Sequence, residues 1–154
     1  DIPVSTLLKL AKMPNIVALK ENSPSLEKWD ENGVLLKDIL TVVSGNGDLH
    51  EPFAGLLGSE GIISGIANFS PGRVLEIYEA QSQNDFIKAR ELHRNLLPIA
   101  NFYKGSSSSR YIVYLKEIMN LMGIPAGPAR LPLVPLNNNE KLEVEKVIRS
   151  LNLI

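Results

Sequence analysis

Three short, mostly apolar runs recur about every twenty to twenty-five residues in the first half of the chain, at residues 16–19, 41–45 and 61–66. Each is followed by a segment with helical spacing of its apolar residues. Continuous apolar runs of this length are typical of strands buried on both faces. Strand and helix in regular alternation predict an α/β fold with a parallel sheet. Three strands are few for a closed sheet.

The expected helices begin or end at prolines, glycines and capping residues, which are the usual helix boundaries. In the first half they occupy residues 4–12, 23–36 and 49–57, with another beginning near Pro71. From Asn84 onward only helical patterns occur, at residues 86–102, 111–122 and 140–151. Residues 123–135 are rich in proline and glycine and predict an extended loop.

Charge and cysteine content exclude several classes of function. The 154 residues include 16 basic and 17 acidic side chains with interleaved signs, which disfavours nucleic acid or a membrane surface as a partner. The absence of cysteine excludes disulfides and thiolate nucleophiles and fits a reducing compartment. No apolar run is long enough to cross a bilayer and the start is not a signal peptide, so we expect a cytoplasmic protein. From the abrupt start we expect a portion of a longer chain.

Lys20 stands at the end of the first apolar run. An ammonium group at the tip of a buried strand loses hydration, which costs stability. Enzymes with parallel sheets place catalytic side chains at the carboxyl ends of the strands, where the following loops form the pocket. An amine in apolar surroundings there can attack a carbonyl group and form an imine. The protonated imine withdraws electrons, so a ketone can gain or lose a carbanion equivalent without a metal.

The simpler interpretation of Lys20 is a side chain that reaches from a strand end into water, and position alone favours it. Glu21 is expected on the opposite face of the strand, because successive side chains alternate. We therefore expect Glu21 to form a salt bridge on the helix side rather than to act as a catalytic partner.

Four motifs favour the catalytic interpretation of Lys20 over the simpler one. LAKMPNIVALKENS, VVSGNGD, GSEGIISGIANFSP and MGIPAGPARLPLVPL occur in this order. They closely resemble motifs of the dihydrodipicolinate synthase and N-acetylneuraminate lyase superfamily of pyruvate-handling class I aldolases. The resemblance covers essentially the whole chain. It implies the C-terminal part of a TIM (β/α)8 barrel, about strands six to eight, at residues 1–82, and a C-terminal helical extension of the same domain at residues 83–154.

The resemblance also implies site residues. In the family, the lysine of the motif that ends in KE forms the Schiff base with pyruvate, which implies a catalytic role for Lys20. Gly45 is implied to line the substrate pocket, and Ile63 to offer its main-chain carbonyl to the substrate. Taken alone, Gly45 could equally be a turn glycine and Ile63 a core residue. Gly65 stands where sialic-acid lyases carry a serine that binds the sugar chain, which weakens the case for a polyhydroxylated substrate.

Departures from the family pattern limit what can be transferred. SGNGD has about one residue more than the usual motif, so neither Asn46 nor Asp48 is assigned a family role. Strands one to five are expected to be missing, together with the threonines that bind the pyruvate carboxylate, the proton-relaying tyrosine and the arginine of strand five. Catalysis by Lys20 would then need the N-terminal half of the barrel as a partner. The resemblance implies no cofactor, and a homotetramer built partly through the C-terminal helices.

Two classes of function remain. The first is a Schiff-base lyase or aldolase, dihydrodipicolinate synthase-like, that joins pyruvate to an aldehyde or keto acid or cleaves the product. A 2-keto-3-deoxy sugar acid aldolase or an N-acetylneuraminate lyase is the alternative enzyme. The second class is an inactive half-barrel fragment or paralogue with a role in assembly, whose open strand edges should associate.

The remaining candidate residues are predicted to be structural. His50 and His93 lack carboxylates at metal-ligand spacing, and we expect surface or hydrogen-bonded histidines rather than a metal site. Tyr111 and Tyr114 lie in an apolar helical pattern and are expected to pack between helices.

Overall fold

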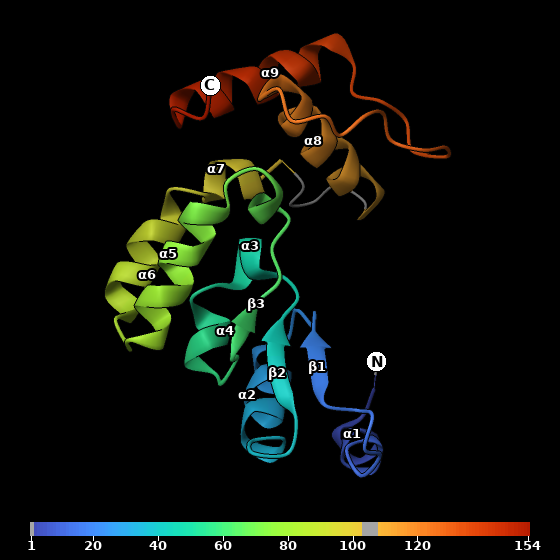
Figure 1. The fold of residues 1–154 in the computed structure, drawn as a ribbon, viewed down its shortest axis with the longest axis vertical. Coiled ribbons are helices and arrows are strands. Elements are labelled where there is room, and N and C mark those ends of the chain that lie inside the picture. Colours follow the sequence, from blue (N-terminus) through green and yellow to red (C-terminus); the bar gives the residue numbers. More distant parts are fainter. Residues whose placement is uncertain (1, 103–107) are drawn as a thin grey trace.

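The structure is a computed structural model that describes residues 2–102 and 108–154 (Figure 1). Three parallel strands form one sheet in the order β1-β2-β3. They are β1 (Ala18–Glu21), β2 (Thr41–Ser44) and β3 (Gly61–Ile62). The register places Lys20 opposite Val43. The predicted parallel sheet and its strand sequence are therefore confirmed, although β3 is shorter than the run at residues 61–66.

The helices follow in the predicted chain order. They are α1 (Val4–Leu10), α2 (Leu26–Leu35), α3 (Gly47–His50), α4 (Phe53–Leu56), the short 3-10 helix η1 (Ile66–Asn68), α5 (Pro71–Ser82), α6 (Phe86–Arg94), α7 (Leu97–Ala100), α8 (Ser108–Leu121) and α9 (Asn138–Ser150). Within the described ranges, none of these helices combines the length and the apolar character needed to cross a bilayer.

Prolines account for two differences from the predicted helices. The helix expected at residues 49–57 is divided into α3 and α4 at Pro52, and the one expected at residues 86–102 is divided into α6 and α7 just before Pro98. Proline has no N–H to donate and its ring collides with the preceding turn, so each proline starts a new helix instead of continuing the old one. Gly58 ends α4 with a φ of +98°, as its position predicted.

Two groups of buried side chains form the core. The smaller packs α1 and α2 against β2 and α4 and consists of Leu7, Trp29, Leu36, Leu40, Val42 and Ala54. The larger extends from η1 and α5 through α6 to α9. Ile66 and Ile77 from the first part of the chain share this larger core with Ile99, Ile118 and Ile148 from the second part. The predicted division into a partial barrel at residues 1–82 and a helical extension at residues 83–154 stays a prediction.

Strand β1 is covered on one face only, contrary to the expectation of burial on both. Glu21 points toward α2 and is 6% exposed. Ala18 and Lys20 point to the opposite face, because side chains alternate along a strand, and both are exposed. No described segment of the chain packs against this second face of β1, so both residues remain in contact with solvent.

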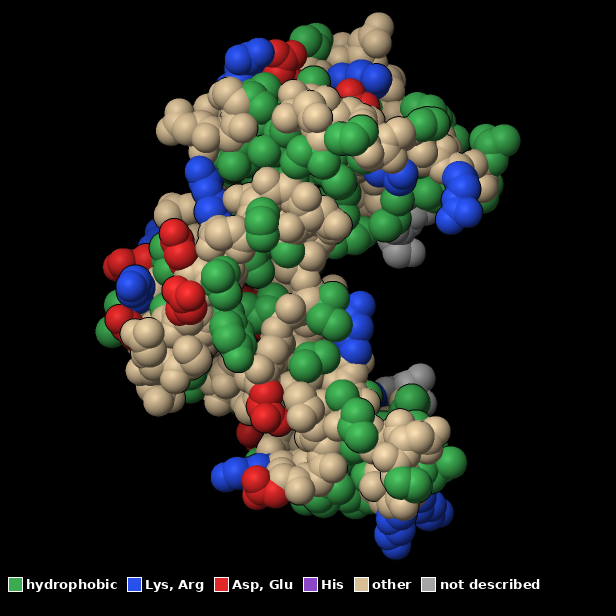
Figure 2. Space-filling model, viewed as in Figure 1, with side chains coloured by type: hydrophobic (Ala, Val, Ile, Leu, Met, Phe, Trp, Pro, Cys, Tyr) green, Lys and Arg blue, Asp and Glu red, His purple; other side chains and the backbone are tan. Residues whose placement is uncertain are grey.

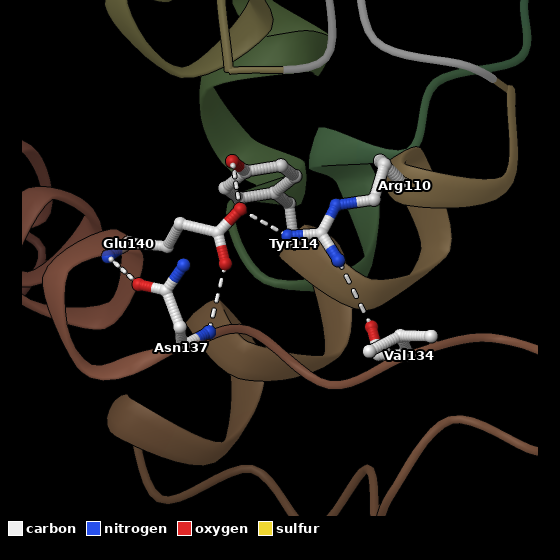
Figure 3. Close-up of polar contacts among 5 residues, drawn as sticks. All are labelled: Arg110, Tyr114, Val134, Asn137 and Glu140. Carbon is white, nitrogen blue, oxygen red and sulfur yellow. Dashed lines mark hydrogen bonds and ion pairs between the residues drawn. The ribbon is translucent and has the colours of Figure 1, made fainter.

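A cluster of polar contacts joins the start of α8 to the start of α9 (Figure 3). The Glu140 carboxylate accepts hydrogen bonds from Arg110 and, at 3.5 Å, from the Tyr114 hydroxyl. Arg110 also donates to the Val134 carbonyl at 3.0 Å. Glu140 and Asn137 form a reciprocal capping box at the N-terminus of α9. These contacts hold the first turns of α8, which carry part of the candidate site.

Candidate functional site

A cleft of about 480 Å³ lies at the carboxyl edge of the sheet. Lys20, Gly45 and Ile63, from the ends of the three strands, line it together with Asp48 from α3 and Tyr111 from α8. Figure 2 shows the corresponding side of the molecule hollowed between the C-terminal helices and β1. The three residues singled out in the sequence therefore lie in one cleft.

Lys20 and Gly45 are in close contact. A Cβ atom built at Gly45 would lie 2.7 Å from Lys20 Cε and 1.7 Å from Asn22 Oδ1. The backbone N–H of Gly45 donates to the Glu21 carbonyl at 2.8 Å, so the pairing of β1 and β2 continues to this residue. Glycine is the residue that allows the lysine side chain to cross the strand end at this point.

The Lys20 side chain is exposed in this structure, whereas the sequence predicted an amine at the tip of a buried strand. It lies on the face of the sheet away from α2, as alternation along the strand requires. That face is open over β1 in the described part of the chain. The predicted position at the rim of the sheet is observed, and the predicted shelter is not.

Ile63 extends the edge of β3. Its backbone N–H donates to the Ser44 carbonyl at 2.7 Å, and its carbonyl oxygen would lie 3.3 Å from a Cβ at Gly47. The side chain is 46% exposed, so the interpretation of Ile63 as a core residue is wrong. The main chain of Ile63 borders the cleft instead.

Glu21 faces the helix side, as predicted, but its contacts differ from a salt bridge. Its carboxylate accepts hydrogen bonds at 2.6 Å from the Asn32 side-chain amide and at 2.6 Å from the backbone N–H of Ser23. Both donors belong to α2 or to the turn before it. Glu21 thus fixes the start of the loop that follows Lys20.

Asp48 is the most connected side chain of the cleft. It is 7% exposed, and its carboxylate accepts hydrogen bonds from the Ser64 hydroxyl and from the backbone N–H groups of Gly65 at 3.1 Å and Ile66 at 3.4 Å. The Tyr111 hydroxyl donates to the same carboxylate at 3.3 Å. Asp48 therefore joins the segment after β2 to the segment after β3 and to α8.

The Tyr111 phenol is kept protonated by its surroundings. Burial raises the pKa of Tyr111, and the negative charge of Asp48 and the hydrogen bond to it raise the pKa further. A neutral phenol in this place can bind a ligand by hydrogen bonding, but it is a poor candidate for a general base at neutral pH.

The two histidines lie behind the cleft. His93 is 4% exposed, and its Nε2 donates to the Asp48 carbonyl at 3.0 Å, so the expectation of a hydrogen-bonded histidine is confirmed. Burial lowers the pKa of His93, while the hydrogen bond to Asp48 opposes this shift. Burial also lowers the pKa of His50, and the charge of His93 lowers it further. The two histidines are therefore neighbours rather than isolated residues.

Sequence reasoning missed Asp48 and Tyr111. A carboxylate shortly after a parallel strand was a usable signal for Asp48, because this edge of a sheet carries functional side chains. Tyr111 had no such signal, since its apolar helical spacing is the pattern of a packing residue. Within residues 2–102 and 108–154, no three histidine or acidic side chains gather as metal ligands would.

Comparison with known proteins places the chain in one family. The sequence model of the dihydrodipicolinate synthetase family matches residues 1–151. The 4-hydroxy-tetrahydrodipicolinate synthase of Methanocaldococcus jannaschii is 36% identical over 153 residues, which are 99% of this chain and 50% of that protein. The family resemblance of the four motifs is thereby confirmed.

Comparison with solved structures also finds dihydrodipicolinate synthases. A dihydrodipicolinate synthase from Thermotoga maritima matches with a TM-score of 0.88 and 27% identity, over 99% of this chain and 51% of that one. One from Bacillus clausii has the same fold, with a TM-score of 0.91 and 24% identity over 98% of this chain and 52% of that one. The chain thus spans about half the length of the relatives that it matches, and it belongs to the dihydrodipicolinate synthetase family.

Proposed function

We propose that this chain carries the Schiff-base lysine of a pyruvate-dependent lyase or aldolase, and that Lys20 is that lysine. The observation that carries the proposal is the convergence of Lys20, Gly45 and Ile63 on one cleft at the carboxyl edge of a parallel sheet. Family membership supports it, since the curated relatives are named as synthases of this family. Gly45 leaves room for the lysine, and the main chain of Ile63 borders the substrate.

The chemistry follows from an amine and a keto acid. Lys20 Nζ attacks the keto carbon of pyruvate, and loss of water leaves a protonated imine. The methyl group then loses a proton to give an enamine, whose carbon attacks the carbonyl carbon of a second substrate and forms the new carbon–carbon bond. The carbonyl oxygen takes a proton and becomes a hydroxyl group. Water finally hydrolyses the imine, which releases the product and restores the amine. Cleavage is the same sequence in reverse.

We further propose that β1, β2 and β3 are the sixth to eighth strands of a (β/α)8 barrel, with residues 83–154 as its helical extension. The chain covers about half of its relatives, and in the described part β1 and β3 are each paired on one side only. An N-terminal half would pair with these two edges and cover the open face of β1. It would also shelter Lys20 and supply the groups that bind the pyruvate carboxylate. Assembly into a homotetramer belongs to this proposal.

The exposure of Lys20 favours a second candidate function, an inactive half-barrel that serves assembly. An amine in contact with water lacks the sheltered, apolar surroundings in which a lysine attacks a carbonyl group. The two candidates differ in whether Lys20 reacts with pyruvate.

Borohydride reduction with pyruvate separates these candidates, because it converts the imine into a stable secondary amine. The 154-residue chain is treated alone and together with the N-terminal half of the relative from the sequence comparison, and intact mass and peptide mapping locate the adduct. We expect one adduct, at Lys20, that is absent in Lys20→Ala and unchanged in Lys12→Ala. An adduct in the mixture alone would show that the second half completes the site. No adduct under either condition, or an adduct at another lysine, would overturn the proposal in favour of the assembly role.

A further inference from the structure

A second cavity, of about 290 Å³, lies between α4, β3 and the C-terminal end of α5. It is separate from the cleft that contains Lys20, because the two have no lining residue in common. Glu51 lines this second cavity, although the residue is only 1% exposed. The proposed Schiff-base chemistry makes no use of this carboxyl group.

Glu51 is a buried acidic residue without a basic partner. No lysine, arginine or histidine in the described part of the chain forms an ion pair with it. Buried charges in proteins are normally paired or bound to a metal ion, because an isolated charge loses its hydration. Burial raises the pKa of Glu51, and the nearby donors of Gln81, Ser44 and Gly55 oppose this rise only in part. The ionised carboxylate therefore lacks a compensating positive charge.

The side chain of Gln81 adds an acceptor beside this carboxylate. Its amide nitrogen donates to Glu51 and, at 3.4 Å, to the Pro52 carbonyl. A Cβ atom built at Gly55 would lie 2.0 Å from that nitrogen, so glycine leaves the space through which the amide reaches Glu51. The Oε1 atoms of Glu51 and Gln81 are both buried, and neither has a hydrogen-bond partner among the described residues. Unpaired acceptors of this kind call for a ligand, such as a water molecule or an ion.

Two serine hydroxyls of the cavity lining are also acceptors toward a ligand. Ser59 donates to the Gly61 carbonyl at 2.9 Å, and Ser82 donates to the Glu79 carbonyl at 2.8 Å. A hydroxyl group has one proton, so only the lone pairs of these two oxygen atoms remain available. The exposed Glu60 adds a second carboxylate, and none of the lining residues is basic. The lining therefore favours a positively charged ligand over a water molecule.

We propose that this cavity binds a monovalent metal cation, sodium or potassium, between the Glu51 carboxylate and the side-chain oxygen of Gln81. Oxygen atoms of carboxylates, amides and hydroxyls are the ligands that hard cations prefer. A single positive charge balances the one buried carboxylate. The site is independent of the proposed Schiff-base function and stabilises the packing of α4 against α5.

Urea denaturation of the 154-residue chain in different salts tests the proposal. Sodium or potassium chloride replaces choline chloride stepwise at a constant total concentration, so that charge screening stays the same. A single site present only in the folded chain raises the folded-to-unfolded ratio by the factor 1 + [cation]/Kd. We expect this ratio to rise about tenfold for each tenfold increase of sodium or potassium above Kd.

Glu51→Gln removes the charge and keeps the size of the side chain, so it should abolish the response to both cations. Glu76→Gln is the matched control, because Glu76 is an exposed residue of α5 that does not line the cavity. It should respond as the wild type does. Gln81→Leu is a second variant, which keeps the carboxylate and removes the other proposed ligand. It should raise the cation concentration needed for half of the effect by at least about tenfold.

Four results would overturn the proposal. The same folded-to-unfolded ratio in all three salts would show that water or a proton satisfies the Glu51 carboxyl group. A wild-type response in both Glu51→Gln and Gln81→Leu would place the cation elsewhere, and loss of the response in Glu76→Gln would indicate a general effect of surface charge. Stabilisation by magnesium or calcium chloride alone would exclude a monovalent site. The Schiff-base function is tested separately, by the borohydride experiment.

Discussion

The side chain of Lys20 crosses Gly45 so closely that a methyl group at position 45 would lie 2.7 Å from Lys20 Cε. The atoms that Gly45→Ala would meet belong to the ends of two exposed side chains, those of Lys20 and Asn22, which can move away. We therefore expect Gly45→Ala to change the stability of the chain by less than about 1 kcal/mol. The displaced amine should form the pyruvate adduct about 100-fold more slowly, because small misplacements of a reacting group are costly.

The rate of borohydride-trapped adduct formation, read by intact mass, measures this effect. Gly72→Ala is the matched control, since nothing lies within 4 Å of a Cβ at Gly72 on α5. Gly72→Ala should keep the wild-type rate. A wild-type rate in Gly45→Ala would show that the contact with Gly45 does not position Lys20.

The link between Glu21 and Asn32 should contribute strongly to folding. Asn32 is fully buried and donates to the buried Glu21 carboxylate, so Asn32→Ala leaves this carboxylate with one donor fewer. Hydrogen bonds to charged groups are typically worth about 1.5 to 3 kcal/mol, and we expect a loss of about 2 kcal/mol in the free energy of unfolding. Urea denaturation measures it.

Glu31→Ala provides the comparison, because Glu31 is an exposed residue of the same helix. It should change the free energy of unfolding by no more than about 0.5 kcal/mol. Equal effects of Asn32→Ala and Glu31→Ala would indicate that helix propensity, and not the buried hydrogen bond, determines the loss.

Much of the fold could be predicted from sequence, because it depends on local patterns. The three apolar runs, the prolines and the glycines identified the three strands and most helices, and alternation along β1 placed Glu21 on the helix side. The division of two expected helices at Pro52 and Pro98 could have been anticipated from the same rule by which prolines bound the other expected helices.

The candidate site was less predictable. Lys20, Gly45 and Ile63 lie on neighbouring strand ends, so a parallel sheet brings them together automatically. Tyr111 reaches the cleft from 63 positions beyond Asp48, and nothing local in either residue indicates this contact. The exposure of Lys20 also depends on what covers the second face of β1, which lies outside any local pattern.

The buried His93 predicts a specific pH dependence of stability. Its pKa in the folded chain lies below the ordinary value of 6.5, so between these two values the unfolded chain binds more protons than the folded one. The contribution of His93 is then fully present above about pH 6.5 and is lost as the pH falls through its folded-state pKa. Urea denaturation of wild type and His93→Gln from about pH 7.5 to about pH 5 should show the steeper loss in wild type.

Glutamine keeps an N–H donor for the Asp48 carbonyl but does not titrate in this range, which makes it the appropriate replacement. His50 contributes a dependence of the same sign, because its pKa is also lowered, and it remains in both proteins. The difference between the two curves therefore reports His93 together with the part of the lowered His50 pKa that the charge of His93 causes. Parallel curves would exclude a contribution from its titration.

The packing of Gly65 against Tyr111 can be tested without any activity. Gly65→Ala places a methyl group 1.7 Å from the Tyr111 hydroxyl oxygen, and Asp48 resists displacement of that hydroxyl, so we expect a loss of about 1 to 3 kcal/mol in the free energy of unfolding. Tyr111→Ala removes the ring, and of the three nearest atoms Leu115 Cδ1, at 2.8 Å, then remains. In that background Gly65→Ala should cost at least about 1 kcal/mol less, a coupling that urea denaturation of the four proteins measures as a double-mutant cycle. Additive losses would mean that the tyrosine hydroxyl does not take the place of a side chain at position 65.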